Sequence, residues 1–486
     1  MNWKMIWKII AYILLVEIVL MIPACLISVV DGETAAVKGF LLTFVLMAVI
    51  AGVLLLLTHN AVKGRFYARD GLVTTGLTWI IMSALGCLPF VFAGAIPSFI
   101  DAMFEMVSGF TTTGSSILKN VEAVPRGLLW WRSFSHWAGG MGVLVFLMAI
   151  VRLGKKNQGF TLHIMRAESP GPAVGKMVPR LKDTAAILYW LYIGLTALNV
   201  FFLLIGGMPV FDAFCTAFGT AGTGGFGIKN DSMASYSPYL QNVTTVFMLL
   251  FSCNFSVYYL MVTKRLKDAF EDEEFRLFWS IVGISIVLMW IAALPNYTNI
   301  WTALKDAAFT VATIISTTGF ATTDFNKWVP FAHALIIFLM FCGACAGSTG
   351  GGIKHVRLLV LWRTLRRNIH KSLHPSEVRS IMYNGRPVDE QIVDNISAYL
   401  IVYVLIVIVS VLIVSIDGFS FETNFSAVMA TFNNIGPGLG SVGPSSNFSA
   451  YSNLSKIVMT LDMLAGRLEI YPILVLFSRS TWKKAR

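Results

Sequence analysis

The chain has 486 residues, of which 56% are hydrophobic and only 13% charged, and its formal net charge is +11. Its mean hydropathy of +0.71 lies outside the range of soluble domains, in which about a quarter of the residues are charged. The composition excludes an ordinary soluble domain and predicts a polytopic membrane protein.

The first two apolar runs predict two retained transmembrane helices. The run from Ile9 to Val30 is too long for the apolar part of a signal peptide, and a second run, Leu41 to Leu57, follows soon after it. The sequence IPAC at 22–25 faintly resembles a lipidation site, but an ordinary helix end is the better interpretation.

The positive charge is clustered between the apolar runs. Of the 37 Lys and Arg residues, 28 lie in six segments, which are the N-terminus and residues 59–71, 152–183, 264–276, 354–394 and 479–486. The apolar runs between these segments allow an even number of membrane crossings from one segment to the next. All six basic segments are therefore placed on the same side of the membrane. The positive-inside rule makes that side cytoplasmic, with both termini there. The basic excess therefore indicates topology first, not a nucleic-acid partner.

Four segments of the chain repeat one layout. They are DAMFEMVSGFTTTG (101–114), DAFCTAFGTAGTGG (212–225), DAAFTVATIISTTG (306–319) and TNFSAVMATFNNIG (423–436). The first three begin with Asp101, Asp212 and Asp306, whereas Thr423, preceded by Glu422, takes that place in the fourth.

Each segment lies between two longer apolar runs, each close to the ~20 residues that span a bilayer. The leading runs are about 72–94, 184–206, 277–294 and 396–416, and the trailing runs are about 128–151, 240–263, 332–362 and 453–478. The apolar pieces inside the segments are too short to cross. Each repeat is therefore predicted to be a helix, a half-helix that enters from outside and returns, and a second helix.

These elements predict an all-α polytopic membrane protein with ten spans, in which four pseudo-repeats of helix, pore helix and helix surround a central ion pore. Two extra transmembrane helices precede the repeats. The predicted divisions are 1–71 for the N-terminal helices and their loop, then 72–183, 184–276, 277–394 and 395–486 for the four pore repeats.

The glycine loops after the half-helices are the candidate ion-binding site. Irregular backbone at membrane depth is tolerated only where protein buries it or a water-filled cavity adjoins it. A half-helix that starts at an Asp near the outer surface points its partially negative carbonyl end inward, and four such ends favour a cation. Glycine lets the following backbone turn its carbonyls toward the axis, as in potassium filters. The candidate residues are Thr112, Thr113, Gly114, Thr223, Gly224, Gly225, Thr317, Thr318, Gly319, Asn434, Ile435 and Gly436. The second loop, at 222–227, is so rich in glycine that a register shifted by one residue stays open.

The loops TTTGSS, GTGGFG, STTGFAT and NNIGPGLG, the stretch from Trp131 to Gly142, and the interruption AGSTGGG (346–352) together resemble the TrkH/TrkG branch of the Trk/Ktr/HKT potassium transporters. The resemblance covers nearly the whole chain. It implies potassium uptake through a channel-like pore in the bacterial cytoplasmic (inner) membrane, by a homodimer without enzymatic activity. In plant relatives a serine at the first filter position is associated with sodium conduction, whereas all four positions here are glycine.

A glycine-rich interruption, GACAGSTGGG (343–352), breaks the trailing run of the third repeat. It is not a P-loop, because Gly352 is followed by Ile353 and Lys354 instead of Lys and Ser or Thr. A hinge that only lets helices cross stays open as an interpretation, and the resemblance implies a flexible gate beneath the filter. The gate residues would be Gly343, Gly347, Ser348, Thr349, Gly350, Gly351 and Gly352.

Arg467 lies midway along the last apolar run, where a charge costs roughly 2.5–3.5 kcal/mol on insertion scales. One possible role is a salt bridge to Asp462 or Glu469. The resemblance implies another, in which Arg467 is a cation below the filter that pairs with the gate loop.

Two predicted cytoplasmic segments, 152–183 and 363–394, form a basic face that includes Lys155, Lys156, Arg166, Arg363, Arg366, Arg367, Lys371 and Arg379. Topology or membrane-lipid headgroups explain this face. The resemblance adds docking of a TrkA-type regulatory subunit, which would carry NAD and ATP, since no nucleotide site is visible in this chain. We expect no bound cofactor here and K⁺ as the transported ion.

Two pairs of residues have the spacing of other sites. His370 and His374 have metal-ligand spacing, but two histidines by themselves are a weak signal, so a solvated segment is favoured. Cys342 and Cys345 have redox spacing, but packing of small residues in a membrane run is favoured.

Two other classes of membrane protein fit the sequence less well. An intramembrane enzyme needs convergent catalytic groups, whereas the seven histidines are dispersed along the chain. A transporter with inverted repeats would alternate their orientation, whereas these four run parallel. The alternative that stays open is a sodium- or proton-coupled cation symporter with weak discrimination between K⁺ and Na⁺.

Overall fold

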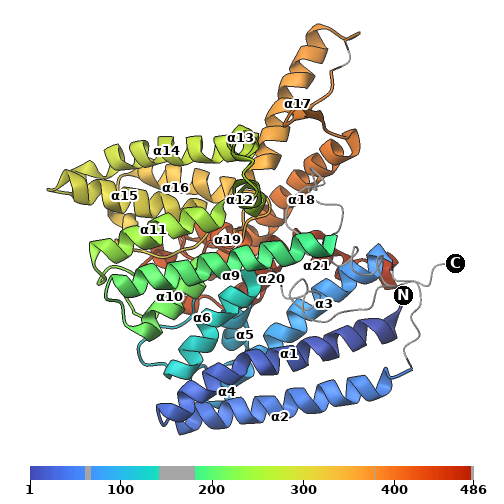
Figure 1. Ribbon diagram of the computed structural model, residues 1–486, viewed down its shortest axis with the longest axis vertical. Coiled ribbons are helices and arrows are strands. Elements are labelled where there is room, and N and C mark those ends of the chain that lie inside the picture. Colours follow the sequence, from blue (N-terminus) through green and yellow to red (C-terminus); the bar gives the residue numbers. More distant parts are fainter. Residues whose placement is uncertain (61–66, 141, 143–180, 378, 483–486) are drawn as a thin grey trace.

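The computed structural model describes the chain except for residues 61–66, 141, 143–180, 378 and 483–486. Within that part the regular elements are helices, apart from one antiparallel pair of short strands, β1 (Met382–Tyr383) and β2 (Arg386–Pro387). The prediction of an all-α membrane fold is confirmed. The chain starts with α1 (Trp3–Val30) and α2 (Thr34–Leu57), which lie side by side (Figure 1).

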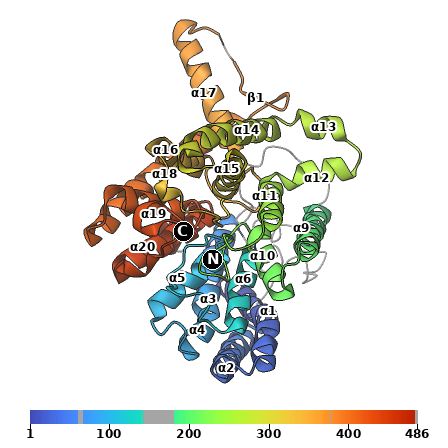
Figure 2. The same cartoon turned by 90° about the vertical axis from the view of Figure 1, so that its left-hand side faces the viewer.

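Each of the four repeats contains a leading helix, a short pore helix and a trailing segment. The leading helices are α3 (Ala68–Gly86) continued by α4 (Leu88–Phe92), α9 (Leu181–Ile205), α14 (Glu273–Ala293) and α18 (Glu390–Val414). The pore helices are α5 (Phe99–Phe110), α10 (Val210–Ala221), α15 (Ile300–Ile315) and α19 (Phe421–Phe432). Figure 2 shows the repeats arranged around a common centre in chain order.

The trailing segments are α6 (Arg126–Gly140), α11 (Pro238–Ser252) with α12 (Phe255–Val262), α16 (Pro330–Cys342) with α17 (His355–Leu373), and α20 (Asn453–Arg467) with α21 (Tyr471–Phe477). Short helices α13 (Leu266–Glu271) and α22 (Arg479–Trp482) complete the set, with 3₁₀ turns at 294–296, 325–327, 415–417, 440–442 and 448–450. The indole rings of Trp3 and Trp482 stack 5.5 Å apart, so the two ends of the described chain meet at one end of the bundle.

Six described helices are long and apolar enough to cross a membrane without a break. They are the N-terminal pair and the four leading helices, with spans Trp3–Val30, Thr34–Leu57, Ala68–Phe92, Ile187–Ile205, Glu273–Asn296 and Glu390–Asp417. The sequence predicted an interruption in the third trailing run, and the structure has two further breaks. The helices α11 and α12 bend by 92°, and α20 and α21 are separated at 468–470. Part of the first trailing run, 143–151, lies outside the described residues.

Local polar groups explain the unpredicted breaks. The side chain of Asn254 caps α12 by accepting a hydrogen bond from the Ser256 N–H at 2.9 Å, which starts a new helix there. At the second break, Glu469 and Ile470 both have positive φ, +59° and +68°. Average hydropathy detects neither feature.

The half-helices do not all begin where the sequence predicted. Asp101 and Asp212 lie in the first turns of α5 and α10, as expected. In the third repeat Asn299 caps the helix, which begins at Ile300, so the expectation that Asp306 starts it is wrong. Asp306 is instead buried in the second turn and accepts a hydrogen bond from the Thr322 hydroxyl at 3.0 Å.

An ion pair joins the last repeat to the first. Lys456 in α20 donates to Asp101 in α5 at 2.6 Å, and the Lys456 side chain is 6% exposed.

We expect Lys456→Met to lower the thermal midpoint of the detergent-solubilised protein, since a hydrogen bond between charged groups contributes about 1.5–3 kcal/mol. Lys327, which is 80% exposed and lies 4.0 Å from Asp324, is the control, and Lys327→Met should change little. Equal effects of the two substitutions would contradict a role of the Lys456–Asp101 pair in joining the last repeat to the first.

Candidate functional site

The four pore helices end in the same way. The second residue after each helix end has a left-handed backbone, with φ of +56° at Thr112, +54° at Thr223, +58° at Thr317 and +55° at Asn434. The next N–H reaches back five residues along the helix, in the bonds Thr113 to Ser108 (2.8 Å), Gly224 to Gly219 (2.8 Å), Thr318 to Thr313 (2.9 Å) and Ile435 to Ala430 (2.8 Å). This is the Schellman helix end. Threonine rarely adopts such angles, so their recurrence indicates a conformation that the surroundings impose.

The four candidate glycines form a closed ring of contacts. Their φ values are +84° at Gly114, +71° at Gly225, +90° at Gly319 and +103° at Gly436. A Cβ on Gly114 would lie 2.0 Å from the carbonyl oxygen of Gly224, and one on Gly225 would lie 2.0 Å from that of Thr318. The series continues from Gly319 to the Ile435 oxygen at 2.2 Å and from Gly436 to the Thr113 oxygen at 2.9 Å. Each loop therefore lies against the next, and the fourth lies against the first.

This ring brings together the four loops that contain the twelve predicted ion-binding residues. The second loop adopts the same backbone angles at Thr223 and Gly225 as its counterparts, which favours the register that places Gly225 in the glycine column. The arrangement presents backbone carbonyls at the partially negative ends of four helices, which is favourable for a cation.

Side chains also link the first and fourth loops. The Asn434 amide donates to the Thr113 hydroxyl at 2.9 Å, and the Ser115 hydroxyl donates to the Gly436 carbonyl at 2.9 Å. Among the described residues, the Thr112 hydroxyl and the Asn434 side-chain oxygen are buried without a hydrogen-bond partner in the protein.

A buried ion pair supports the first two loops. Arg132 in α6 and Glu105 in α5 lie 2.7 Å apart, with side chains 3% and 1% exposed. Arg132 also donates to the Ser116 hydroxyl at 3.1 Å and to the Gly227 carbonyl at 2.9 Å. One guanidinium therefore connects the segments that follow Gly114 and Gly225.

His136 lies one turn further along α6 and joins the same two repeats. Its Nε2 accepts a hydrogen bond from the Phe226 N–H at 3.3 Å, which leaves Nδ1 to donate to the Gly109 carbonyl at 2.8 Å. Sequence reasoning missed Glu105, Arg132 and His136 as supporting residues, although Arg132 was part of the resemblance. Charged residues inside apolar runs were the signal that marks them.

The interruption between α16 and α17 lies against the pore-helix ends of repeats three and four. The Gly351 N–H donates to the Thr317 hydroxyl at 2.7 Å, and a Cβ on Gly351 would lie 2.2 Å from the Asn433 carbonyl oxygen. Gly350 also lies close to the end of the third pore helix, because a Cβ on it would lie 2.8 Å from the Ser316 carbonyl oxygen. The predicted gate segment therefore contacts the helix ends next to the ring.

The other predicted gate residues form the turns of this segment or donate hydrogen bonds that stabilise it. Gly343, Gly347 and Gly352 have positive φ, at +63°, +70° and +79°. The Ser348 hydroxyl donates to the Cys345 carbonyl at 2.6 Å, and the Thr349 hydroxyl donates to the Phe251 carbonyl at 3.2 Å.

Arg467 links this segment to α6. Its guanidinium donates to the carbonyl oxygens of Thr349 at 2.7 Å, Gly139 at 2.6 Å and Gly140 at 2.7 Å. Of the two acids that the sequence suggested as its partners, Asp462 accepts from the Ser410 hydroxyl and Glu469 pairs with Arg357. The geometry therefore favours the contact with the gate loop.

The described part of the predicted basic face lies on α17 and the turn after it, which project from the body (Figures 1 and 2). Arg363, Arg367 and Arg379 pair with Glu273, Glu390 and Glu377, so acids partly balance the charge of this face. Hydrogen bonds from His370 and Arg379 lower the pKa of the Glu377 carboxyl below its ordinary value. Lys155, Lys156 and Arg166 lie outside the described residues.

The remaining predicted pairs contact other groups. His370 bonds Glu377 at 2.6 Å and lies beside His374, with ring centroids 4.8 Å apart and ring planes tilted by 43°. Cys342 and Cys345 are buried free thiols.

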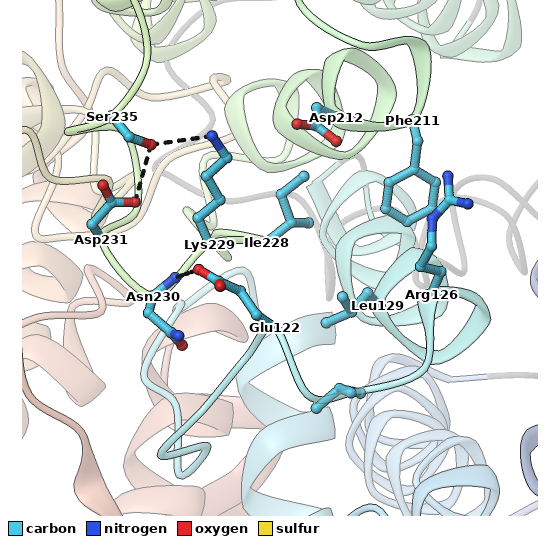
Figure 3. A pocket seen from close by; sticks show the side chains of 11 residues that line it. Glu122, Arg126, Leu129, Phe211, Asp212, Ile228, Lys229, Asn230, Asp231 and Ser235 are labelled. Carbon is cyan, nitrogen blue, oxygen red and sulfur yellow. Dashed lines mark hydrogen bonds between the residues drawn. The ribbon is translucent and has the colours of Figure 1, made fainter.

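An open pocket of about 580 Å³ lies between the segments that follow the first two pore loops (Figure 3). Its lining carries both signs of charge, with Glu122, Asp212 and Asp231 against Arg126 and Lys229. The Asn230 N–H donates to Glu122 at 3.0 Å across it. The pocket was not predicted from the sequence.

The chain is similar to known transport proteins along its whole length. A family profile, TrkH, described as a cation transport protein, matches residues 37–484. The Trk system potassium uptake protein TrkH of Escherichia coli K12 is 33% identical over 493 residues, which cover all of both chains. TrkG of the same organism is 31% identical over 91% of each chain. The crystal structure of the potassium transporter TrkH from Vibrio parahaemolyticus matches with a TM-score of 0.88 at 31% identity, covering 99% of this chain and 100% of that one.

We expect the Arg132–Glu105 pair to be strongly coupled. Arg132→Met leaves a buried carboxylate without its partner, which typically costs about 3–5 kcal/mol, so the thermal midpoint should fall markedly. Adding Glu105→Gln should recover part of the loss, because the uncompensated charge is removed. A double-mutant cycle measured by thermal unfolding in detergent tests this, and additive effects of the two substitutions would show that the pair does not act as a unit.

Proposed function

The chain belongs to the TrkH family of cation transport proteins, and from this membership we propose that it takes up potassium through the ring of four glycine loops. As a member of the Trk potassium uptake family it is a membrane transporter and not an enzyme. The observation that supports the proposed pathway best is the closed series of contacts in which each glycine lies against the carbonyl of the next loop.

In the proposed filter, backbone carbonyls replace the hydration shell of K⁺ at the convergent ends of four helices. The residues are the three of each loop that end at Gly114, Gly225, Gly319 and Gly436. Positive φ at these glycines supports the assignment, because a Cβ is disfavoured there both by backbone angle and by contact. An inward-negative membrane potential would drive entry with roughly 2.3 kcal/mol per charge per 100 mV.

We propose that the segment 343–352 is the gate of this pathway, with Arg467 as the cation that holds it. The bond from Arg467 to Thr349 and the bond from Gly351 to Thr317 support a closed state in which the segment lies directly against the filter. A fixed positive charge at this point would also oppose passage of K⁺.

We further propose a location and partners. The protein would lie in the bacterial inner membrane with both termini cytoplasmic, as a homodimer that binds a TrkA-type subunit through the basic segments 152–183 and 363–394. The projecting α17 supports docking, since Trp362, Leu365, Ile369 and Leu373 are exposed along it at helical spacing. NAD or ATP would be bound by that partner, and lipid headgroups are the other ligands of the basic residues.

Gly114→Ser tests the filter. Its φ of +84° and the 2.0 Å contact with the Gly224 oxygen leave no room for a side chain, so we expect the ratio of K⁺ to Na⁺ flux to fall by about tenfold, or ~1.4 kcal/mol. The measurement is flux into liposomes at fixed potential with competing sodium. Gly94→Ser is the matched control, because Gly94 has φ of +74° but no atom within 4 Å of its Cβ position. An unchanged ratio in Gly114→Ser would remove the filter assignment, and flux that requires a sodium or proton gradient would favour symport.

Arg467→Ala tests the gate. Removal of three hydrogen bonds and one positive charge should raise potassium flux several-fold at the same potential, provided that the variant elutes and melts as a folded protein. The exposed Arg479 serves as control, and Arg479→Ala should leave the flux unchanged. Flux equal to that of the unsubstituted protein in folded Arg467→Ala would show that Arg467 does not hold a gate.

A further inference from the structure

A single buried carboxylate contacts both ends of the segment between α16 and α17. Glu274 lies in the first turn of α14 and is 1% exposed. Its Oε1 accepts a hydrogen bond from the Ala346 N–H at 2.7 Å and another from the Val356 N–H at 3.0 Å. Ala346 lies near the start of the segment, and Val356 lies in the first turn of α17 after its end.

We propose that Glu274 is the positioning residue that holds this segment closed, by binding its two ends to the leading helix of the same repeat. The proposal rests on the proposed role of the segment as a gate. Glu274 was not among the residues that the sequence singled out, and it contacts neither the glycine ring nor the ion path.

The backbone between the two bonded amides requires such a restraint. Gly347, Gly352 and Lys354 all have positive φ, and at Lys354, with φ of +78°, a side chain makes this conformation unfavourable. Unfavourable angles persist only where the surroundings determine them. The bond to Val356 fixes the chain two residues after Lys354, and the Lys354 ammonium, itself 2% exposed, donates to the Gly350 carbonyl.

The position of Glu274 suits it to this task, because one carboxyl oxygen meets both amides. In its ionised form the carboxylate would accept these hydrogen bonds more strongly than a neutral acceptor does, and the first-turn amides of α17 form the positive end of a helix dipole. Burial removes water as a competing partner. An amide at the same position would accept the same two bonds more weakly.

Glu274 and Arg467 hold different parts of the segment. Arg467 bonds Thr349 in the middle, from the side of the fourth repeat, whereas Glu274 bonds both ends, from the side of the third. Loss of Glu274 should therefore free the ends while the central bond remains. Movement of α17, which projects from the body, would act on Val356 directly.

The test measures the position of the segment separately from transport. Ser348→Cys places a thiol on the segment, and its rate of labelling by a polar thiol reagent in the full-length protein in liposomes is compared with and without Glu274→Gln. We expect labelling to rise by about tenfold in Glu274→Gln, because both bonds to the segment become weaker, and potassium flux to rise with it. Glu271→Gln is the control, since that side chain is 54% exposed and lies 4.0 Å from Lys267. The protein without Ser348→Cys gives the background from the six native thiols.

The outcomes separate this inference from the proposed function. Unchanged labelling in folded Glu274→Gln would overturn the role of Glu274, and a rise in flux in Arg467→Ala would leave the gate itself supported. Faster labelling without faster flux would support Glu274 as a positioning residue and overturn the gate. If Glu274→Gln does not fold, hydrogen exchange of the unsubstituted protein decides, because the Ala346 and Val356 amides should be protected and should open together. Fast exchange of either amide would overturn the proposal.

Discussion

The close approach of each ring glycine to the carbonyl of the next loop is the constraint on which the rest of the structure depends. With a Cβ 2.0 to 2.9 Å from a neighbouring oxygen, no other residue fits at these positions without moving the adjacent loop. The four loops are therefore mutually dependent, and a shift in one is transmitted to both neighbours. The left-handed residue at each pore-helix end then has a clear purpose, because it turns the chain from the helix into this ring.

A ring built from four different sequences needs support that differs from place to place. Arg132 and His136 support the first two loops from α6, while Asn434 and Ser115 connect the fourth loop with the first. Buried ion pairs such as Arg132–Glu105 add little net stability compared with apolar packing. Their hydrogen bonds do fix the register between loops, and we attribute their presence to that requirement.

The sequence predicted those parts of the fold that depend on local pattern. The glycine column, the pore helices and the leading spans are each encoded within some 20 residues, and repetition made them visible. The breaks at Asn254 and Glu469 were missed because mean hydropathy over a run hides one cap or one turn. The support by Glu105, Arg132 and His136 was missed for another reason. Their side-chain contacts join residues 11 to 95 positions apart, and only the folded chain shows which polar groups meet.

The breaks in the trailing segments explain how a polar junction is able to form inside an apolar bundle. A continuous helix satisfies its own carbonyls and offers none to a neighbour, whereas a helix end or an irregular segment exposes them. Arg467 bonds carbonyls at the end of α6 and in the segment before α17, and Thr349 bonds a carbonyl at the end of α11. Arg467 and Thr349 therefore connect the ends of α6 and α11 with the segment before α17, next to the pore-helix ends. Because a few hydrogen bonds make these connections, a change at one of them is expected to alter the position of the segment.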